Sequence, residues 1–95
     1  MKKITFIYLA TCPYCANARR AMAELKEENP ACRQVPFEAI DEAAEPDKAA
    51  VYGDSYYYVP TFFVDGKKLY EASPDDTYEI IRDHVKEVFR AAMQD

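Results

Sequence analysis

Two cysteines mark the junction between a strand pattern and a helix pattern near the start of the chain. Residues 4–9 form an almost continuous run of β-branched and aromatic side chains, which favours a central strand covered on both faces. A Cys-Pro-Tyr-Cys motif follows at 12–15, and apolar residues then recur at helical spacing over 16–28. Cys12 suits the N-cap position, and Pro13 suits the first helical position because its φ is already helical. The sequence therefore predicts a strand–turn–helix unit with two thiols at the turn.

The middle of the chain predicts a second strand, a short helix and a hairpin. Pro36 cannot donate to a strand ladder, so the strand expected over residues 35–41 belongs at a sheet edge. A short, irregular helix is expected over 42–52. Residues 61–64 and 67–70 predict two antiparallel strands, because the Asp-Gly pair between them is a hairpin turn signal.

A last helix is expected to begin at Ser73, because a capping serine is followed by Pro74 and two acids. The resulting order is β-α-β-α-β-β-α. Its first two strands and the helix between them should form a right-handed βαβ unit. The chain of 95 residues is long enough for one α/β domain spanning 1–95 and too short for two. The stripe expected to be buried on the last helix is Tyr78, Ile81, Val85, Val88 and Ala92.

Charge and cysteine content exclude several classes of function. The formal net charge of −5 argues against binding to nucleic acid or to anionic lipid, both of which need basic surfaces. The apolar run behind Lys2 and Lys3 makes a poor signal peptide and is too short to span a bilayer. Three cysteines do not suggest a secreted disulfide framework. We therefore expect a cytoplasmic protein with no nucleic-acid or membrane partner.

The spacing of the two motif cysteines suits disulfide exchange, whose attacking group is a thiolate. At a helix N-terminus, Cys12 faces unsatisfied backbone N–H groups and the positive end of the helix dipole, and both favour the anion. Cys15 lies one turn further along, where Cβ atoms three residues apart are about 5–6 Å from each other. We expect Cys12 to attack a substrate disulfide and Cys15 to resolve the mixed disulfide that results.

With Cys-Pro-Tyr-Cys at the first strand–helix junction and Val59-Pro60-Thr61 before the hairpin, the chain resembles the thioredoxin superfamily. Within that superfamily the motif is similar to that of dithiol glutaredoxins. The resemblance covers almost the full length and implies a thioredoxin-like fold with a four-stranded mixed sheet flanked by helices. It also implies that Pro60 is cis and lies against the thiols, and that the backbone of Val59 pairs with an extended substrate.

The same resemblance implies a binding groove beside the thiols and an acidic residue that holds the γ-glutamyl end of glutathione. Where glutaredoxins usually carry two glycines before an acidic pair, this chain has residues 71–73, Glu-Ala-Ser. The residues expected to bind substrate are Thr11, Pro13, Tyr14, Tyr58, Val59, Pro60 and Asp76.

The predicted activity is that of a monomeric thiol–disulfide oxidoreductase with no bound cofactor. Its expected partners are protein disulfides, with glutathione as a co-substrate, and either glutathione or thioredoxin reductase as the electron donor. No metal site is expected. A structural zinc ion needs four ligands, and the only residues that could join the motif cysteines, Cys32 and His84, are far apart in the sequence. Two alternatives stay open: a glutathione-assisted iron–sulfur cluster carrier or redox sensor, and a noncatalytic binding domain.

Overall fold

A four-stranded mixed sheet in the order β2-β1-β3-β4 forms the middle of the molecule. The structure is a computed structural model, and it describes residues 1–94. The elements follow one another as a thioredoxin-like β-α-β-α-β-β-α chain, which confirms the fold class and the strand count expected from the sequence. They are β1 (Ile4–Tyr8), α1 (Pro13–Glu28), a 3₁₀ turn η1 (Pro30–Gln34), β2 (Phe37–Asp41), α2 (Pro46–Ala50), β3 (Thr61–Val64), β4 (Lys67–Glu71) and α3 (Tyr78–Met93).

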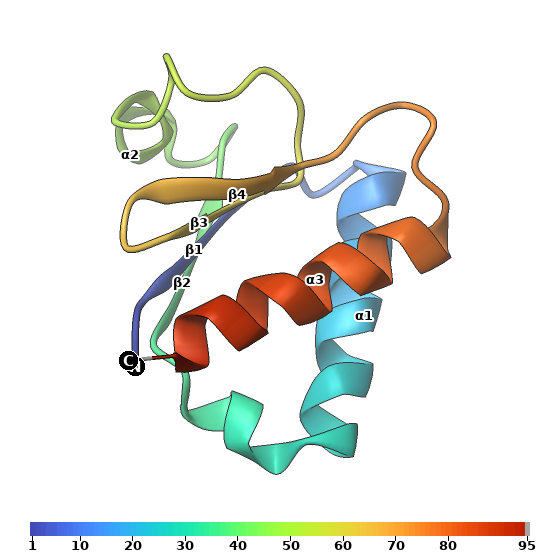
Figure 1. Cartoon of the computed structure of the whole chain (residues 1–95). Coiled ribbons are helices and arrows are strands. Elements are labelled where there is room, and N and C mark those ends of the chain that lie inside the picture. The colour runs from blue at the N-terminus through green and yellow to red at the C-terminus, as the bar shows by residue number, and fades with distance from the viewer. Residues whose placement is uncertain (95) are drawn as a thin grey trace.

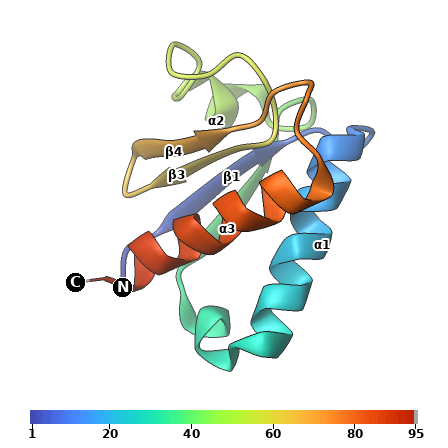
Figure 2. The ribbon, with the colours of Figure 1, turned by 45° about the vertical axis from the view of Figure 1, so that its right-hand side comes forward.

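The two long helices cover one face of the sheet, and α2 with its connecting segments covers the other (Figure 1). The larger hydrophobic cluster lies under α1 and α3, where residues of β1 and β3 such as Phe6 and Phe62 pack against Val85 and Phe89. A smaller cluster on the opposite face contains Ile7, Ile40, Ala49 and Phe63. The start of the chain and the end of α3 lie close together (Figure 2), and the N–H of Lys2 donates to the carbonyl of Ala92 at 2.8 Å.

The positions of β1 and β2 match the sequence expectations. β1 pairs in parallel with β2 and antiparallel with β3, so it is the central strand that its apolar run predicts. β2 is an edge strand, as expected, but it begins at Phe37, two residues later than expected, so Pro36 lies just before it. The carbonyl of Pro36 still accepts the N–H of Ile4 at 2.9 Å, because proline lacks only the donor.

The hairpin between β3 and β4 carries a register shift. Its turn is formed by Asp65 and Gly66, both with positive φ (48° and 82°), as in a type I′ turn. The pairing shifts at the Phe62/Phe63 step, where Phe63 pairs with Lys68 and Phe62 pairs with Tyr70. Leu69 is left out of the pairing, as in a β-bulge. The shift brings Glu71, the last residue of β4, opposite Thr61, the first residue of β3.

The start of the last helix was predicted wrongly. α3 begins at Tyr78, and its N-cap is Thr77, whose side chain accepts the N–H of Ile80 at 3.2 Å. Ser73 instead begins a turn, which the N–H of Asp76 closes by donating to the Ser73 carbonyl at 3.0 Å. The Asp76 carboxylate accepts hydrogen bonds from the Ser73 N–H and the Tyr70 hydroxyl, so it points back to β4 instead of capping a helix.

The second helix is shorter than the expected span of 42–52. α2 covers Pro46–Ala50 only. Before it, the carboxylate of Asp41 accepts the N–H groups of Ala43 and Ala44 at 3.0 and 3.2 Å. This side chain offers the backbone an alternative to helical pairing, which is a common effect of aspartate and explains the delayed start.

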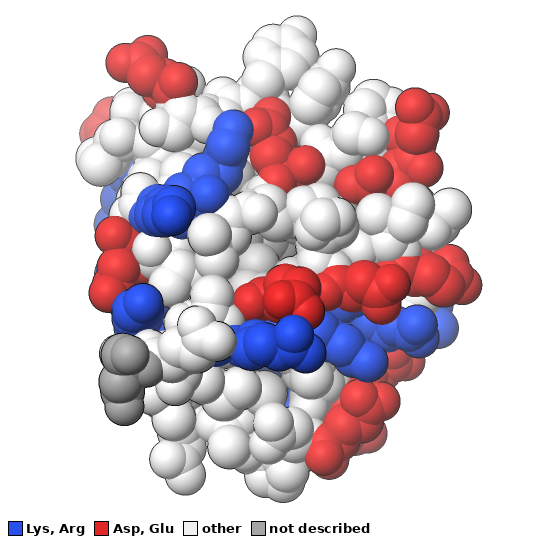
Figure 3. All heavy atoms as spheres, in the orientation of Figure 1, with Lys and Arg blue, Asp and Glu red and all other residues white. Residues whose placement is uncertain are grey.

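Acidic and basic side chains are interspersed over the face seen in Figure 3, and acidic groups gather at the end where the loop between β4 and α3 lies. Several of the charges pair within one element, for example Arg90 with Glu87 at 2.8 Å. Among residues 1–94, no helix is long and apolar enough to cross a membrane.

Replacement of Phe62 should test the core. Phe62 is fully buried, and its ring stacks on Phe6 with the ring centroids 4.9 Å apart. We expect Phe62→Ala to lower the free energy of unfolding by about 3–5 kcal/mol, because it removes buried surface and leaves a cavity. The exposed Val51 offers a control, and Val51→Ala should stay within about 0.5 kcal/mol of the parent. Urea unfolding measures both, and a Phe62→Ala loss no larger than that of the control would contradict this core assignment.

Candidate functional site

The two motif cysteines occupy the first turn of α1, as the sequence predicts. Cys12 is the N-cap, with extended backbone (φ −83°, ψ 120°), and its Sγ accepts the N–H of Cys15 at 3.2 Å. Cys12 is half-buried, whereas Cys15 is fully buried, and both are free thiols. One sulfur is therefore open to a substrate and the other lies directly behind it.

The environment of the two thiols is asymmetric. Burial raises the pKa of the Cys15 thiol well above its ordinary value, and its hydrogen bond with Cys12 raises it further. The sulfur of Cys12 faces a backbone N–H at a helix N-terminus, which stabilises a negative charge there. The first sulfur therefore has a hydrogen-bond donor beside it, whereas burial disfavours ionisation of the second.

The cis bond between Val59 and Pro60 lies beside this pair. The Cys12 thiol donates to the carbonyl oxygen of Val59, with 3.7 Å between sulfur and oxygen. The expectation that Pro60 is cis is thus confirmed, and the carbonyl of the residue before it lies next to the Cys12 sulfur. Pro60 is buried and directly precedes β3, and its carbonyl accepts the N–H of Ala72 at 3.0 Å. The sheet therefore holds the segment that faces Cys12.

Tyr14 joins the motif to the loop before α3. Its hydroxyl donates to the carbonyl of Pro74 at 2.6 Å, so its ring lies between the start of α1 and this loop. The loop also contains Asp76, which was expected to bind substrate. Burial alone would raise the pKa of Asp76, but hydrogen bonds from Tyr70 and Ser73, together with the nearby His84, lower it below its ordinary value. Asp76 is thus a charged anchor of the loop that holds Tyr14.

The other expected substrate-binding residues lie around Cys12 in different degrees of exposure. Thr11 and Pro13 are exposed on either side of Cys12 in the chain, and Tyr58 is exposed beside the half-buried Val59. The fold thus brings the motif, the 58–60 segment and the 73–76 loop to one end of the sheet, where the chain leaves β1 and enters β3 (Figure 1).

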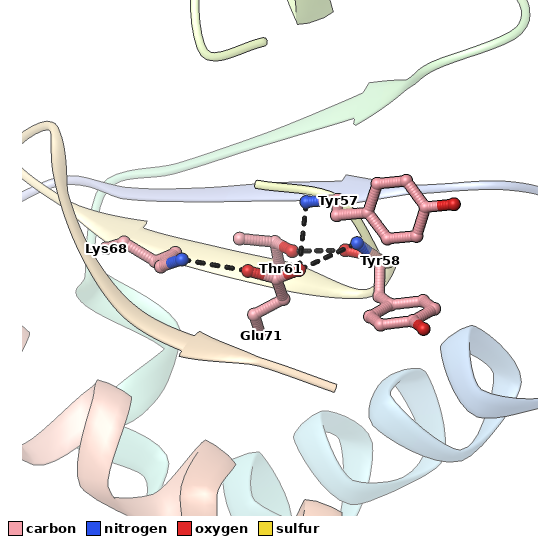
Figure 4. A network of polar contacts seen from close by, with 5 residues as sticks. All are labelled: Tyr57, Tyr58, Thr61, Lys68 and Glu71. Atoms are coloured by element: carbon pink, nitrogen blue, oxygen red, sulfur yellow. Dashed lines mark hydrogen bonds and ion pairs between the residues drawn. The ribbon is translucent and has the colours of Figure 1, made fainter. Parts of the chain in front are cut away.

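A network of polar contacts secures the segment before Val59 (Figure 4). Oε2 of Glu71 accepts the N–H of Tyr57 at 2.9 Å and that of Tyr58 at 2.7 Å. Oε1 of Glu71 pairs with the ammonium of Lys68 at 2.8 Å. The hydroxyl of the buried Thr61 donates to the Tyr58 carbonyl at 2.5 Å. Burial by itself would raise the pKa of Glu71, but the hydrogen bonds that its carboxylate accepts from Lys68, Tyr58 and Tyr57 lower it below its ordinary value.

Sequence reasoning missed Glu71 and the side chain of Thr61 as parts of this site. Thr61 follows the Val-Pro pair directly, which was the available signal. Glu71 could not be found in this way, because an uninterrupted hairpin register would place Tyr70, and not Glu71, opposite Thr61. The register shift at the Phe62/Phe63 step changes that pairing.

Cys32 lies away from the site, in η1 at the far end of α1 (Figure 1). It is almost fully buried, and burial raises the pKa of its thiol, an effect that nearby Lys26 reduces in part. Within residues 1–94, no group of three or more histidine, cysteine or acidic side chains is placed to hold a metal ion.

Comparison with known proteins adds no assignment: no protein-family model matches the sequence, and no curated protein matches it at a significant level. The chemistry of this chain is therefore inferred from its own residues.

Alkylation should distinguish the three thiols. At neutral pH we expect iodoacetamide to modify Cys12 well before Cys15 and Cys32, because the latter two are buried and burial raises the pKa of each. Mass spectrometry of peptides from a time course measures the three rates. Equal modification of Cys12 and Cys15 would contradict the asymmetry described above.

The anchored carboxylate of Asp76 should make stability depend on pH. Its pKa is lower in the folded than in the unfolded chain, where it is about 3.9, so the unfolded chain binds more protons in acid. The stabilisation is present above that value and is lost as the pH falls through the lower folded pKa. We expect the free energy of unfolding of Asp76→Asn to fall less steeply in acid than that of the parent.

Urea unfolding at a series of pH values from neutral to strongly acidic measures this slope. The exposed neighbour Asp75 provides the control, and Asp75→Asn should keep the parental acid dependence. An unchanged slope in Asp76→Asn would show that the hydrogen bonds to its carboxylate do not favour the charged form.

Proposed function

We propose that this chain is a thiol–disulfide oxidoreductase of the thioredoxin superfamily, similar to dithiol glutaredoxins, that reduces protein disulfides or glutathione mixed disulfides. The observation that carries the proposal is the position of one accessible sulfur. Cys12 Sγ lies 3.2 Å from the N–H of Cys15 and 3.7 Å from the Val59 carbonyl, with the buried Cys15 behind it. This combination of an N-capping thiol, a resolving thiol and a cis-proline segment suits the reduction of a disulfide in an extended chain.

In the first step, the Cys12 thiolate attacks one sulfur of the substrate disulfide. A new S–S bond forms between Cys12 and that sulfur, the substrate S–S bond breaks, and the other sulfur leaves as a thiolate that takes up a proton. The N–H of Cys15, at 3.2 Å, supports the anion before the attack. The carbonyl of Val59 lies beside the same sulfur and offers an acceptor to an approaching substrate N–H.

In the second step, Cys15 loses its proton and attacks Cys12 Sγ. The bond between Cys12 and the substrate breaks, the second substrate sulfur leaves as a thiolate, and a Cys12–Cys15 disulfide forms. The protein dithiol has then been oxidised by two electrons and the substrate disulfide reduced by two. Burial, and then the hydrogen bond with Cys12, raises the pKa of Cys15, so Cys15 does not compete with Cys12 as the attacking group in the first step.

Two electrons must return to the protein disulfide. Two molecules of glutathione supply them if glutathione disulfide is the product, and a dithiol reductase such as thioredoxin reductase supplies them otherwise. A coupled assay that follows NADPH oxidation distinguishes the donors, because glutathione with its own reductase and thioredoxin reductase can be added separately. We propose that the protein acts as a monomer with either donor.

Serine variants of the two cysteines test the proposal. Cys12→Ser should abolish reduction of both insulin and a glutathione mixed disulfide, because it removes the attacking sulfur. Cys15→Ser should abolish reduction of insulin, which needs the resolving thiol, and should retain activity on the glutathione mixed disulfide, which a second glutathione can resolve.

The distant thiol supplies the control for both variants. Cys32→Ala should keep the parental activity on both substrates, because Cys32 lies at the other end of α1. If the Cys12→Ser variant still reduces either substrate, the assignment of the attacking group is wrong. If the parent reduces neither substrate with either electron donor, the proposed function fails.

A further inference from the structure

The segment that faces Cys12 is not held in place by burial of its own side chains. Tyr57 is 83% exposed and Tyr58 is 45% exposed, and their rings meet edge to face with centroids 4.8 Å apart. In Figure 4 both rings project away from Lys68, beyond the end of the hairpin. Exposed segments with few buried apolar contacts open easily unless polar contacts hold them. The conformation of this segment therefore depends on its backbone hydrogen bonds.

Those hydrogen bonds converge on one cross-strand pair. The N–H of Tyr58 donates to Glu71, and its carbonyl accepts from Thr61. Glu71 and Thr61 are opposite each other at the end of the β3–β4 hairpin. The peptide groups on both sides of Tyr58 are thus tied to the sheet, and the next carbonyl along the chain, that of Val59, is the one beside Cys12.

The carboxylate of Glu71 has its hydrogen-bonding capacity largely used inside the protein. One oxygen receives two N–H groups and the other receives the ammonium of Lys68. Hydrogen bonds to an ionised carboxylate are stronger than neutral ones, so this side chain holds two successive peptide groups in a fixed orientation. Glu71 can then influence a substrate only indirectly, through the segment of Tyr57 and Tyr58.

We propose that Glu71 is a positioning residue for polypeptide substrates, because it fixes the Tyr57–Tyr58 segment so that the two rings and the Val59 backbone form a preorganised surface next to Cys12. The proposal rests on the proposed function. A polypeptide that reaches Cys12 must also pass over this surface, where an apolar side chain next to its cysteine can pack on the tyrosine rings. A small disulfide that touches only the sulfur does not use it.

Two substrate types separate this role from general stability. The polypeptide substrate is a short peptide with an internal disulfide and a phenylalanine next to one cysteine, and the small substrate is bis(2-hydroxyethyl) disulfide. Loss of an anchor that preorganises a binding surface raises KM more than it lowers kcat. For Glu71→Ala we expect the KM for the peptide to rise about tenfold, because two charge-assisted hydrogen bonds are lost. The ratio of peptide to small-disulfide activity should fall by a similar factor.

Three further variants identify which contact matters. Glu71→Gln keeps a carbonyl oxygen for the two N–H groups, so it should restore most of the peptide KM. Lys68→Ala removes the ion pair and leaves both N–H contacts, so it should resemble the parent. Glu45 forms a matched lysine–glutamate pair three residues apart, with 2.9 Å to Lys48, and Glu45→Ala should leave both activities unchanged.

The outcomes are distinct. If Glu71→Ala leaves the peptide KM unchanged, or lowers both activities equally, the positioning role is wrong. If Lys68→Ala reproduces the full effect of Glu71→Ala, the ion pair rather than the backbone contact is responsible, and the proposal also fails. Thermal unfolding checks that each variant is folded. If Glu71→Ala does not fold, an unaltered KM in a folded Glu71→Asn variant, whose shorter side chain cannot span the same contacts, overturns the proposal.

The activity of the parent protein distinguishes a failure of the Glu71 proposal from a failure of the proposed function. A parent that does not reduce bis(2-hydroxyethyl) disulfide through Cys12 is not the proposed oxidoreductase, whatever the Glu71 variants show. A parent that reduces it and also prefers the phenylalanine peptide over the same peptide with alanine supports the surface directly. Loss of that preference in Glu71→Ala is the expected result.

Discussion

The N–H of Cys15 points at the sulfur of Cys12, and this single contact organises the end of the molecule that carries the thiols. Helix N-caps are usually serine, threonine, aspartate or asparagine, whose oxygens accept a backbone N–H. Here a sulfur occupies that position and performs the same local task. Because the helix must begin there, the accepting sulfur is presented at the helix end with peptide dipoles behind it.

The sheet places the segment before β3 opposite this helix end. β1 delivers the chain to the motif, and the antiparallel neighbour β3 begins with the residue that follows Pro60. The Val59 carbonyl therefore meets the Cys12 sulfur where the two strands lie side by side. The N-terminus of α1 thus lies on one side of the site, and the segment before β3, which the hairpin holds, lies on the other. The geometry of the site therefore depends on the stability of the sheet.

Where an element depends on contacts between residues close together in the chain, the sequence predicted it in most cases. The bounds of β3, the Asp65–Gly66 turn and the N-cap at Cys12 agree with expectation, because each depends on residues within a few positions. The start of α3 disagreed because Tyr70, six residues before Asp76, recruits the carboxylate that would otherwise lie in the first helical turn. Side chains that can serve either a cap or a tertiary contact mislead local reasoning in this way.

The sequence by itself determined a strand–turn–helix unit with two thiols one turn apart, because the contacts that build it lie within the motif and its flanking patterns. No local pattern determines what faces those thiols: the resemblance suggested the segment around Pro60, and the tertiary structure decided it. The Val59 carbonyl is 47 residues from Cys12 along the chain, and sheet pairing brings the two together. The place of Glu71 depends on a one-residue shift in the hairpin register. Such a shift arises from packing on both faces of the sheet, and no alternation of residue types along one strand records it.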